Sequence, residues 1–145
     1  MSDQQFIKNY LQDFIEALKP DDDSVESLIQ VRNLLLEVNS NKKKALIFGN
    51  GGSAAIASHF SVDLTKNAKI KCLNFNEASL ITCLANDYGF EHWAEKAIEF
   101  YGNEGDLLIV ISSSGQSENM LNAVKATRNC NFQSVITLSG FLPRK

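Results

Sequence analysis

The chain has 145 residues, which is the size of one domain and too short for an elaborate multidomain enzyme. Apolar residues make up 44% and charged residues 21% of the sequence, as in globular proteins rather than disordered or low-complexity ones. The net charge of -3 offers no basic field to a nucleic acid, and no stretch reaches the roughly 20 apolar residues that cross a bilayer. We therefore expect no nucleic-acid partner and no membrane span. The polar start lacks the pattern of a signal peptide, which favours a cytoplasmic protein.

Two amphipathic helices are predicted before the first strand. Apolar residues recur at helical spacing between residues 2 and 19, and a second such run follows after a short acidic turn. Ser2 and Gln5 are spaced as a capping box at the start of the first helix, and Asp23 and Glu26 have the same spacing at the start of the second. The apolar faces are broad for a small domain, so we expect part of this surface to pack against another subunit.

Strands and helices alternate in the rest of the chain. Short apolar runs predict strands at residues 45–48, 70–75, 107–111 and 134–138, and helices are expected at 54–66, 77–85, 90–101 and 116–128. This alternation is typical of a parallel sheet that helices cover on both faces. We therefore predict a single domain over residues 1–145 of the α/β class. It would have a three-layer, open parallel sheet of the flavodoxin-like or Rossmann-like kind in residues 41–145, preceded by two helices in residues 1–40.

Two of the predicted strands end in loops of similar composition, and each loop leads into a helix. The first loop contains Asn50, Gly51, Gly52 and Ser53, and the second contains Ser112, Ser113, Ser114, Gly115 and Ser117. Glycines let the backbone approach a ligand closely, and serine hydroxyls and helix N-termini donate hydrogen bonds to anions. Because the carboxyl ends of parallel strands line one crevice, we expect both loops to meet around one small phosphorylated ligand. The alternative is that these residues are ordinary loop and helix-capping residues.

The first loop also satisfies the pattern G-x-G-x-x-A between a strand and a helix, so a nicotinamide dinucleotide is an alternative ligand. That ligand needs an acidic residue at the end of the second strand to bind its ribose. This chain has Asn74 and Asn76 there, with Glu77 slightly later, and we therefore rank the dinucleotide lower. A P-loop is excluded because the pattern G-x-x-x-x-G-K-[ST] does not occur.

Further polar residues are candidates for a site, each with a structural alternative. His59 and Asp63 are four residues apart on one predicted helix, so they share a face and suit either a metal or substrate site or a local hydrogen bond. Asn86 and Asp87 are expected between two helical segments, where they supply an amide and a carboxylate or form a plain turn. Trp93 is expected in the core.

Four motifs together resemble the sugar isomerase (SIS) domain family, and within it the phosphoheptose isomerases. In chain order they are Gly49 to Ser53, His59 with Phe60, Asn86 to Phe90, and Ile111 to Ser117. The resemblance extends from the N-terminal helices to Gly140. It implies an isomerase that converts sedoheptulose 7-phosphate to D-glycero-D-manno-heptose 7-phosphate for heptose, lipopolysaccharide and other surface-polysaccharide biosynthesis. It also implies a homotetramer or dimer with active sites at subunit contacts.

The resemblance further implies a role for each matching residue. Asn50, Gly51, Gly52, Ser53, Asn86 and Asp87 would bind the substrate, and Ser112, Ser113, Ser114 and Ser117 would hold its phosphate. His59 corresponds to a zinc ligand. Asp63 aligns with a family glutamate that binds the metal and is the candidate catalytic base, since a carboxylate beside the ene-diol can move the proton between adjacent carbons.

The sequence departs from the family pattern at two points. Asp63 is one methylene shorter than the family's glutamate, and catalytic groups must be placed to within a fraction of an ångström. Family members continue into another strand and a long helix with a glutamine and a histidine of the catalytic set, whereas this chain ends at Lys145. We therefore expect a shortened form of such a protein. The alternative is a non-catalytic SIS protein that binds a sugar phosphate or acts as a scaffold, as in relatives that bind a bacterial replication initiator.

Overall fold

The computed structural model describes residues 1–140, and the chain divides into two compact units, Met1–Asn33 and Leu34–Lys145. The first unit contains α1 (Asp3–Ala17) and the first part of α2 (Asp22–Ser40), and both helices occur where the apolar spacing predicts them. Within the first unit no residue is buried. In the described part of the chain, no helix is both long and apolar enough to cross a membrane.

Capping side chains begin the two helices, one as predicted and one not. Ser2 accepts a hydrogen bond from the backbone N–H of Gln5 at 3.3 Å, which confirms the predicted cap of α1. The predicted cap at Asp23 is wrong, because Asp21 accepts from the backbone N–H of Ser24 at 2.7 Å and so caps α2 two residues earlier. The hydroxyl and the backbone N–H of Ser24 lower the pKa of Asp21 below its ordinary value.

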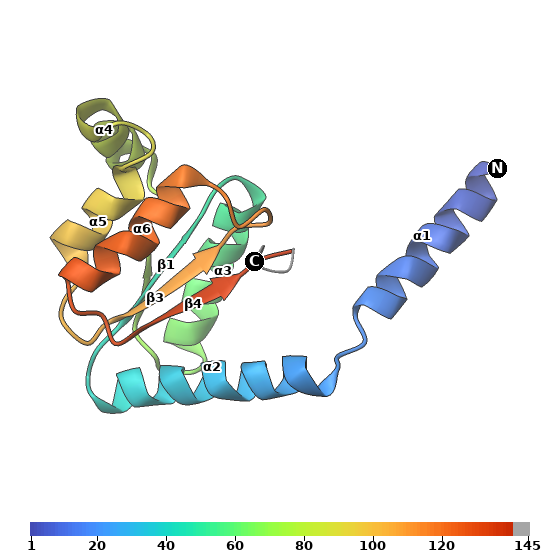
Figure 1. Ribbon diagram of the computed structural model, residues 1–145, viewed down its shortest axis with the longest axis horizontal. Coiled ribbons are helices and arrows are strands. Elements are labelled where there is room, and N and C mark those ends of the chain that lie inside the picture. The colour runs from blue at the N-terminus through green and yellow to red at the C-terminus, as the bar shows by residue number, and fades with distance from the viewer. Residues whose placement is uncertain (141–145) are drawn as a thin grey trace. The chain divides into compact units, whose positions relative to one another are not determined.

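The second unit is built on a four-stranded parallel sheet with the order β2-β1-β3-β4 (Figure 1). Its strands are β1 (Ala45–Gly49), β2 (Cys72–Asn74), β3 (Leu107–Ile111) and β4 (Ser134–Leu138), so all four predicted strands are confirmed, with β2 shorter than expected. Every residue of β1 and β3 is buried, as expected for central strands with helices on both faces.

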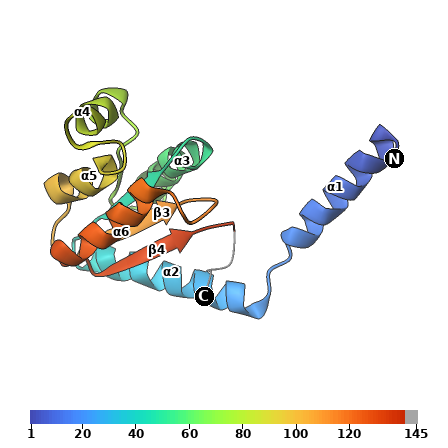
Figure 2. The same cartoon turned by 45° about the horizontal axis from the view of Figure 1, so that its top comes forward.

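Helices on both faces of the sheet complete the three predicted layers of the α/β fold. α5 (Trp93–Tyr101) and α6 (Glu118–Asn129) lie on one face with α4 (Ala78–Tyr88) packed against α5, and α3 (Gly52–Lys66) lies on the other (Figure 2). The main core is on the face of α5 and α6. There the ring of Trp93 lies 5.7 Å from that of Phe48, and Trp93 is only 1% exposed, as predicted.

A buried ion pair joins β1 and β3 at the amino ends of the strands. The carboxylate of Asp106, just before β3, pairs with the ammonium of Lys44, just before β1, and the two side chains are 2% and 17% exposed. The same carboxylate accepts from the backbone N–H groups of Lys44 at 3.1 Å and of Asn103 at 2.9 Å. Because a buried carboxylate without partners is strongly destabilising, these contacts are what allow Asp106 to lie in the interior.

Candidate functional site

The two loops rich in glycine and serine lie side by side, as predicted. β1 and β3 are neighbours in the sheet, and Gly49 at the end of β1 is paired in register with Ile111 at the end of β3. Both loops therefore leave the sheet at the same level. The side chains of Asn50, in the first loop, and Asn119, just after the second, exchange two hydrogen bonds of 3.0 and 2.9 Å. These bonds hold the two loops together at the carboxyl edge of the sheet.

The first loop turns sharply from β1 into α3, and glycines make this turn possible. A Cβ atom on Gly49 would lie 2.7 Å from the backbone carbon and oxygen of Ser53. Gly51 has a φ of 53°, a conformation that other residues seldom adopt. Gly51 is also the N-cap of α3 and has no side chain with which to cap the helix. The N–H groups of Ser53 and Ala54 donate to the carbonyl of Asn50 at 3.0 and 3.3 Å, so in the first turn of α3 the N–H group of Gly52 is the one suited to an external anion.

The second loop ends in the same way at the start of α6. Ser117 is the N-cap of α6, but its hydroxyl makes no capping bond and lies 3.4 Å from the hydroxyl of Ser112. Ser112 is buried, whereas Ser113 and Ser114 are exposed. Gly115, with a φ of 65°, closes the turn by donating its N–H to the carbonyl of Ser112 at 3.1 Å. The loop thus presents several hydroxyl groups beside the N-terminus of α6, where the N–H of Met120 is already bonded to the carbonyl of Ser117 and the N–H groups of Glu118 and Asn119 come before it.

His59 and Asp63 share one face of α3, as their spacing predicts. Nε2 of His59 is 3.7 Å from Oδ2 of Asp63, a distance too long for a hydrogen bond, and Oδ1 of Asp63 accepts from Asn67 at 3.1 Å. Their side chains are 82% and 50% exposed. They line a shallow hollow of about 470 Å³ whose other walls are mostly apolar: Ala55, Ile56 and Phe60. A hollow of this volume is in the range that small ligands occupy.

The first loop leads into the start of α3, whereas His59 lies in the middle of this helix and Asp63 near its end. At 1.5 Å per residue, His59 and Asp63 are about 10 and 16 Å further along the helix axis than Gly52, its first residue. The buried side chains of α3 include Ala57 and Leu64, which are on the sheet side, so the exposed pair is on the outer face. The described part of one chain therefore does not assemble the loops and the carboxylate into a single compact site.

The described residues offer pairs of a histidine and a carboxylate but no larger set of metal ligands, and His59 with Asp63 is one such pair. Within residues 1–140, no group of three or more His, Cys, Asp or Glu side chains is gathered in one place. Catalytic zinc usually takes three protein ligands and structural zinc takes four. The imidazole of His59 and the carboxylate of Asp63 therefore do not fit a zinc ion by themselves.

Asn86 and Asp87 lie in the last turn of α4, so the prediction that they fall between two helical segments is wrong. The helix continues to Tyr88 and ends at Gly89, whose φ of 91° is incompatible with a further helical turn. Asn86 donates to Oδ1 of Asp87 at 2.9 Å, and the thiol of Cys83 lies 3.8 Å from the other carboxylate oxygen. The polar contacts described for this pair are thus local to α4.

Residues at the end of β2 are engaged with the neighbouring helices. The amides of Asn74 and Asn76 donate to acceptors on α3 at 2.8 and 2.7 Å. Glu77 is the N-cap of α4, where its carboxylate accepts from the backbone N–H groups of Ser79 and Leu80, and these bonds lower its pKa. A dinucleotide ribose would need an acidic side chain here. Because the carboxylate of Glu77 already caps α4, the structure gives a further argument against a nicotinamide dinucleotide.

Asn119 is a residue of this region that sequence reasoning missed. It is 3% exposed and lies in the first turn of α6. The sequence marks Asn119 only by its position two residues after Ser117. Many helix residues without a functional role occupy such a position. The pairing of β1 with β3 is what brings Asn119 to Asn50, 69 positions away in the chain.

Comparison with known proteins finds relatives over most of the chain. The sequence model of the SIS domain family matches residues 7–140. The phosphoheptose isomerase of Helicobacter pylori (strain P12) is 38% identical over 132 residues, which cover 86% of this chain and 68% of that protein. The phosphoheptose isomerase of Neisseria gonorrhoeae (strain NCCP11945) is 38% identical over 122 residues, which cover 80% of this chain and 61% of that protein. The chain thus spans about two thirds of the length of these relatives.

Solved structures with the same fold include two proteins of the same description. A phosphoheptose isomerase from Neisseria gonorrhoeae is similar with a TM-score of 0.85 and 29% identity, covering 99% of this chain and 90% of that one. A phosphoheptose isomerase from Francisella tularensis is similar with a TM-score of 0.82 and 30% identity, covering 96% of this chain and 75% of that one. The likeness therefore includes β1, β3 and the loops that follow them.

Proposed function

The chain belongs to the SIS domain family and is homologous to the phosphoheptose isomerases, and on this premise we propose that it isomerises sedoheptulose 7-phosphate to D-glycero-D-manno-heptose 7-phosphate. The observation that carries the proposal is the pair of adjacent loops after β1 and β3, held together through Asn50 and Asn119. The product would serve heptose and lipopolysaccharide biosynthesis, and the reaction would take place in the cytoplasm.

The phosphate group of the substrate is proposed to lie between the two loops. A phosphate monoester carries nearly two negative charges at neutral pH, and neither loop contains a lysine to neutralise them. The donors would be the N–H groups of Gly52, Glu118 and Asn119, which begin α3 and α6, and the hydroxyls of Ser53, Ser112, Ser113, Ser114 and Ser117. Hydrogen bonds to charged groups contribute about 1.5 to 3 kcal/mol each, so a few such donors suffice to bind a sugar phosphate. Asn50, Gly51 and Gly52 would contact the sugar part next to it.

The chemical step is the transfer of one proton between adjacent carbons. A base removes a proton from C1 of the ketose, the C2 carbonyl oxygen is protonated, and an ene-diol forms. Return of a proton to C2, with loss of the proton on O1, then leaves an aldehyde at C1. Asp63 is the proposed base, with one oxygen held by Asn67 and the other facing His59. Asn86 and Asp87 are proposed to contact the substrate from α4.

Zinc binding at His59 and Asp63 is also proposed, although these two residues are fewer than the ligands that zinc usually takes. His59 and Asp63 would supply two ligands, and further ligands would have to come from outside the described residues of one chain. A bound zinc ion would polarise the substrate oxygens. The proton transfer described above is assigned to Asp63 and does not depend on the metal.

A second copy of the chain is the proposed partner that completes the site. Within one chain, Asp63 is about 16 Å along α3 from the start of the helix, further than a proton donor or acceptor can reach. The residues around it, Ala55, Ile56 and Phe60, form an apolar lining that suits burial against protein. We therefore propose a homodimer or homotetramer in which the loops of one copy approach α3 of another.

A second candidate function is a non-catalytic protein that binds a sugar phosphate or acts as a scaffold. Two observations favour it: the two-donor set of His59 and Asp63, and an aspartate in place of the family's glutamate. The serine loops favour retained ligand recognition, which an isomerase and a non-catalytic sugar-phosphate-binding protein both need. Turnover is the property that separates them.

The test measures binding and turnover on the same purified protein. We expect sedoheptulose 7-phosphate to bind and to be converted, with and without added zinc, and we expect Asp63→Asn to lower kcat by about a hundredfold or more while affinity changes little. Replacing Ser53, Ser112 and Ser117 together by alanine should weaken binding by a few kcal/mol, since about 1.5 to 3 kcal/mol is lost per charged hydrogen bond before non-additivity.

The control for these variants is Glu104→Gln, in the turn before β3 and at the other edge of the sheet. It should leave both binding and turnover as they are. Binding without turnover would establish the non-catalytic alternative. Equal affinity of the triple serine variant and the unmodified protein would refute the phosphate assignment, and thermal protection by NAD but not by sugar phosphates would favour the dinucleotide.

A further inference from the structure

Asn119 is buried beside the proposed phosphate loops, and its side chain bonds to the first of them. It is 3% exposed and exchanges two hydrogen bonds with Asn50, of 3.0 and 2.9 Å. We propose that Asn119 is the positioning residue of this site: it fixes the orientation of the Asn50 carboxamide and so determines which groups Asn50 presents to a sugar. This inference rests on the proposed function for the identity of the ligand.

The orientation of the Asn119 carboxamide is set by the backbone of α6. The N–H of Met120 donates to Oδ1 of Asn119 at 3.1 Å and also reaches the carbonyl of Ser117 at 3.0 Å. A backbone N–H only donates, so an amide nitrogen turned toward it would place two donors face to face. The oxygen of Asn119 must therefore face Met120, and its NH2 group is left to face Asn50.

The orientation of Asn50 follows from that of Asn119. Because Nδ2 of Asn119 donates to Asn50, the atom that receives this bond must be the oxygen Oδ1. The NH2 group of Asn50 then donates to Oδ1 of Asn119, closing the reciprocal pair. The first turn of α6 thus dictates, through one side chain, how an amide in the other loop is turned.

The pair leaves Asn50 with a defined set of unused hydrogen-bonding positions. A carboxamide has two N–H donors and an oxygen with two lone pairs, and the reciprocal bonds use one of each on Asn50. One donor and one acceptor position remain, on opposite sides of a carboxamide group whose orientation the pair fixes. A sugar hydroxyl both donates and accepts, and a carbonyl oxygen only accepts, so the free N–H suits either of them and the free acceptor position suits a hydroxyl.

The pairing also carries no net charge, which matters next to an anion-binding loop. Asn119 lies two residues after Ser117, and an acidic residue at this place would repel a phosphate held by the second loop. Two amides hold the loops together without that repulsion. The neutral pair is therefore compatible with tight binding of a phosphorylated ligand between them.

The decisive experiment is a double-mutant cycle with Asn50→Ala and Asn119→Ala in the full chain, measured as kcat and KM for sedoheptulose 7-phosphate. If Asn119 acts through Asn50, Asn119→Ala alone should lower kcat/KM by about tenfold to a hundredfold, the cost of a misplaced active-site group. In the Asn50→Ala background it should have almost no further effect. Equal losses in both backgrounds, or full activity of Asn119→Ala, would overturn the proposal.

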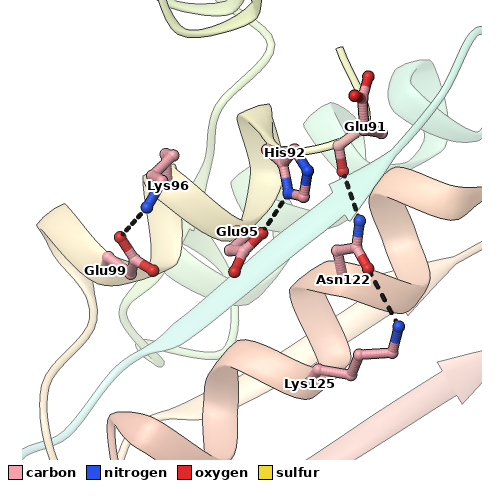
Figure 3. A network of polar contacts seen from close by, with 7 residues as sticks. All are labelled: Glu91, His92, Glu95, Lys96, Glu99, Asn122 and Lys125. Atoms are coloured by element: carbon pink, nitrogen blue, oxygen red, sulfur yellow. Dashed lines mark hydrogen bonds and ion pairs between the residues drawn. The ribbon is translucent and has the colours of Figure 1, made fainter. Parts of the chain in front are cut away.

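Asn122→Ala is the matched control, on the same helix about one turn later. Asn122 donates to the carbonyl of Glu91 at 3.0 Å and accepts from Lys125 at 3.2 Å, as Figure 3 shows, so its contacts run to the start of α5 and not to the loops. Its kcat and KM should match those of the unmodified protein. If Asn119→Ala does not fold, Asn119→Leu replaces it: the size of the side chain is retained, both bonds to Asn50 are lost, and no charge is added.

A second measurement separates this inference from the proposed function. In the unmodified protein with 15N-labelled asparagine, the two side-chain N–H protons of Asn50 should differ widely in chemical shift and exchange slowly with water, because one of them is hydrogen-bonded. In Asn119→Leu or Asn119→Ala this difference should collapse, because no acceptor remains for the Asn50 N–H, and in Asn122→Ala it should persist. Absence of binding and turnover in the unmodified protein would refute the proposed function alone. An unchanged Asn50 amide signal in the Asn119 variants would refute the positioning role alone.

Discussion

Gly49 is the residue on which the path of the first ligand loop most directly depends. The chain leaves β1 and turns back so tightly that a Cβ atom at this position would lie 2.7 Å from the backbone of Ser53. Backbone atoms in the first turn of a helix cannot move away cheaply, so this space is available only to glycine. The close approach also places the backbone of Ser53 next to the end of β1.

Replacement of Gly49 by alanine should therefore lower the free energy of unfolding by about 1 to 3 kcal/mol, the usual cost of overpacking. Urea denaturation of the variant and the unmodified protein measures this difference. The matched control is Gly52→Ala, at the first residue of α3, where a Cβ meets no atom within 4 Å. There alanine should be neutral or stabilising by up to about 1 kcal/mol, because it favours the helix. Equal destabilisation by both substitutions would contradict this account.

The sequence was sufficient to assign the loop residues to a ligand site, but it did not show which other side chains they bond to in the fold. Asn50 and the serines stand out because they follow short apolar runs and precede helices. Asn119 does not, because its role depends on a side chain 69 positions earlier and on the order of strands in the sheet. The separation of Asp63 from the second loop depends likewise on how α3 is packed on the sheet. Sequence spacing gives the position of Asp63 along α3 and on its face, but not the direction of the helix relative to that loop.

At the scale of single elements, α4 shows how a helix end is set by local chemistry. Glu77 accepts from the N–H groups of Ser79 and Leu80 at 3.0 and 2.8 Å, and these bonds lower its pKa below the ordinary value of 4.5. A carboxylate at a helix N-terminus also interacts favourably with the helix dipole. The stabilisation therefore belongs to the ionised form of Glu77.

The contribution of Glu77 should disappear in acid. A group whose pKa is lowered on folding stabilises the protein above its unfolded pKa, and this stabilisation is lost as the pH falls through the folded pKa. At pH 7, Glu77→Gln should have a lower Tm than the unmodified protein, and the two Tm values should converge toward pH 3. Glu104→Gln, in a turn, serves as the control and should show no such convergence. A Tm difference for Glu77→Gln that is the same at pH 7 and pH 3 would refute the capping role.

Most elements were predictable because their apolar patterns are long and clear. β3, apolar at all five positions and bounded by polar residues, occurs over the same residues as predicted. β2 is shorter than its apolar run, since Ile70 and Phe75 are buried without pairing in the sheet, and burial alone does not define a strand. The end of α4 was placed too early because Gly89, not Ala85, stops the helix, and only the backbone conformation distinguishes them.

At the scale of the molecule, the buried residues are confined to the second unit. Those described lie between Leu35 and Ile136, whereas the apolar side chains of α1 are exposed, including Phe6, Phe14 and Ile15. The second unit thus contains its own core, and the first contributes an amphipathic helix with an uncovered apolar face. Such a face is typical of a surface that meets another protein molecule.

Removal of residues 1–20, which keeps Asp21 and all of α2, should separate folding from association. The shortened chain should still unfold cooperatively, because every buried residue described is retained. If α1 contributes to contact between copies, the full chain should be a dimer or tetramer by light scattering, and the shortened chain should be smaller at the same concentration. Unchanged association after the removal would exclude α1 from the interface, and loss of cooperative unfolding would show that the core needs it.

The ion pair of Lys44 and Asp106 has a consequence for how such a protein can diverge. It joins the two central strands at their amino ends, and the loops after β1 and β3 begin at the opposite ends, roughly 13 Å away for a five-residue strand. Mutations that change which metabolite the loops bind do not alter the contacts of this ion pair. During evolution, a few substitutions in these loops can therefore change the ligand, while the ion pair continues to stabilise the sheet.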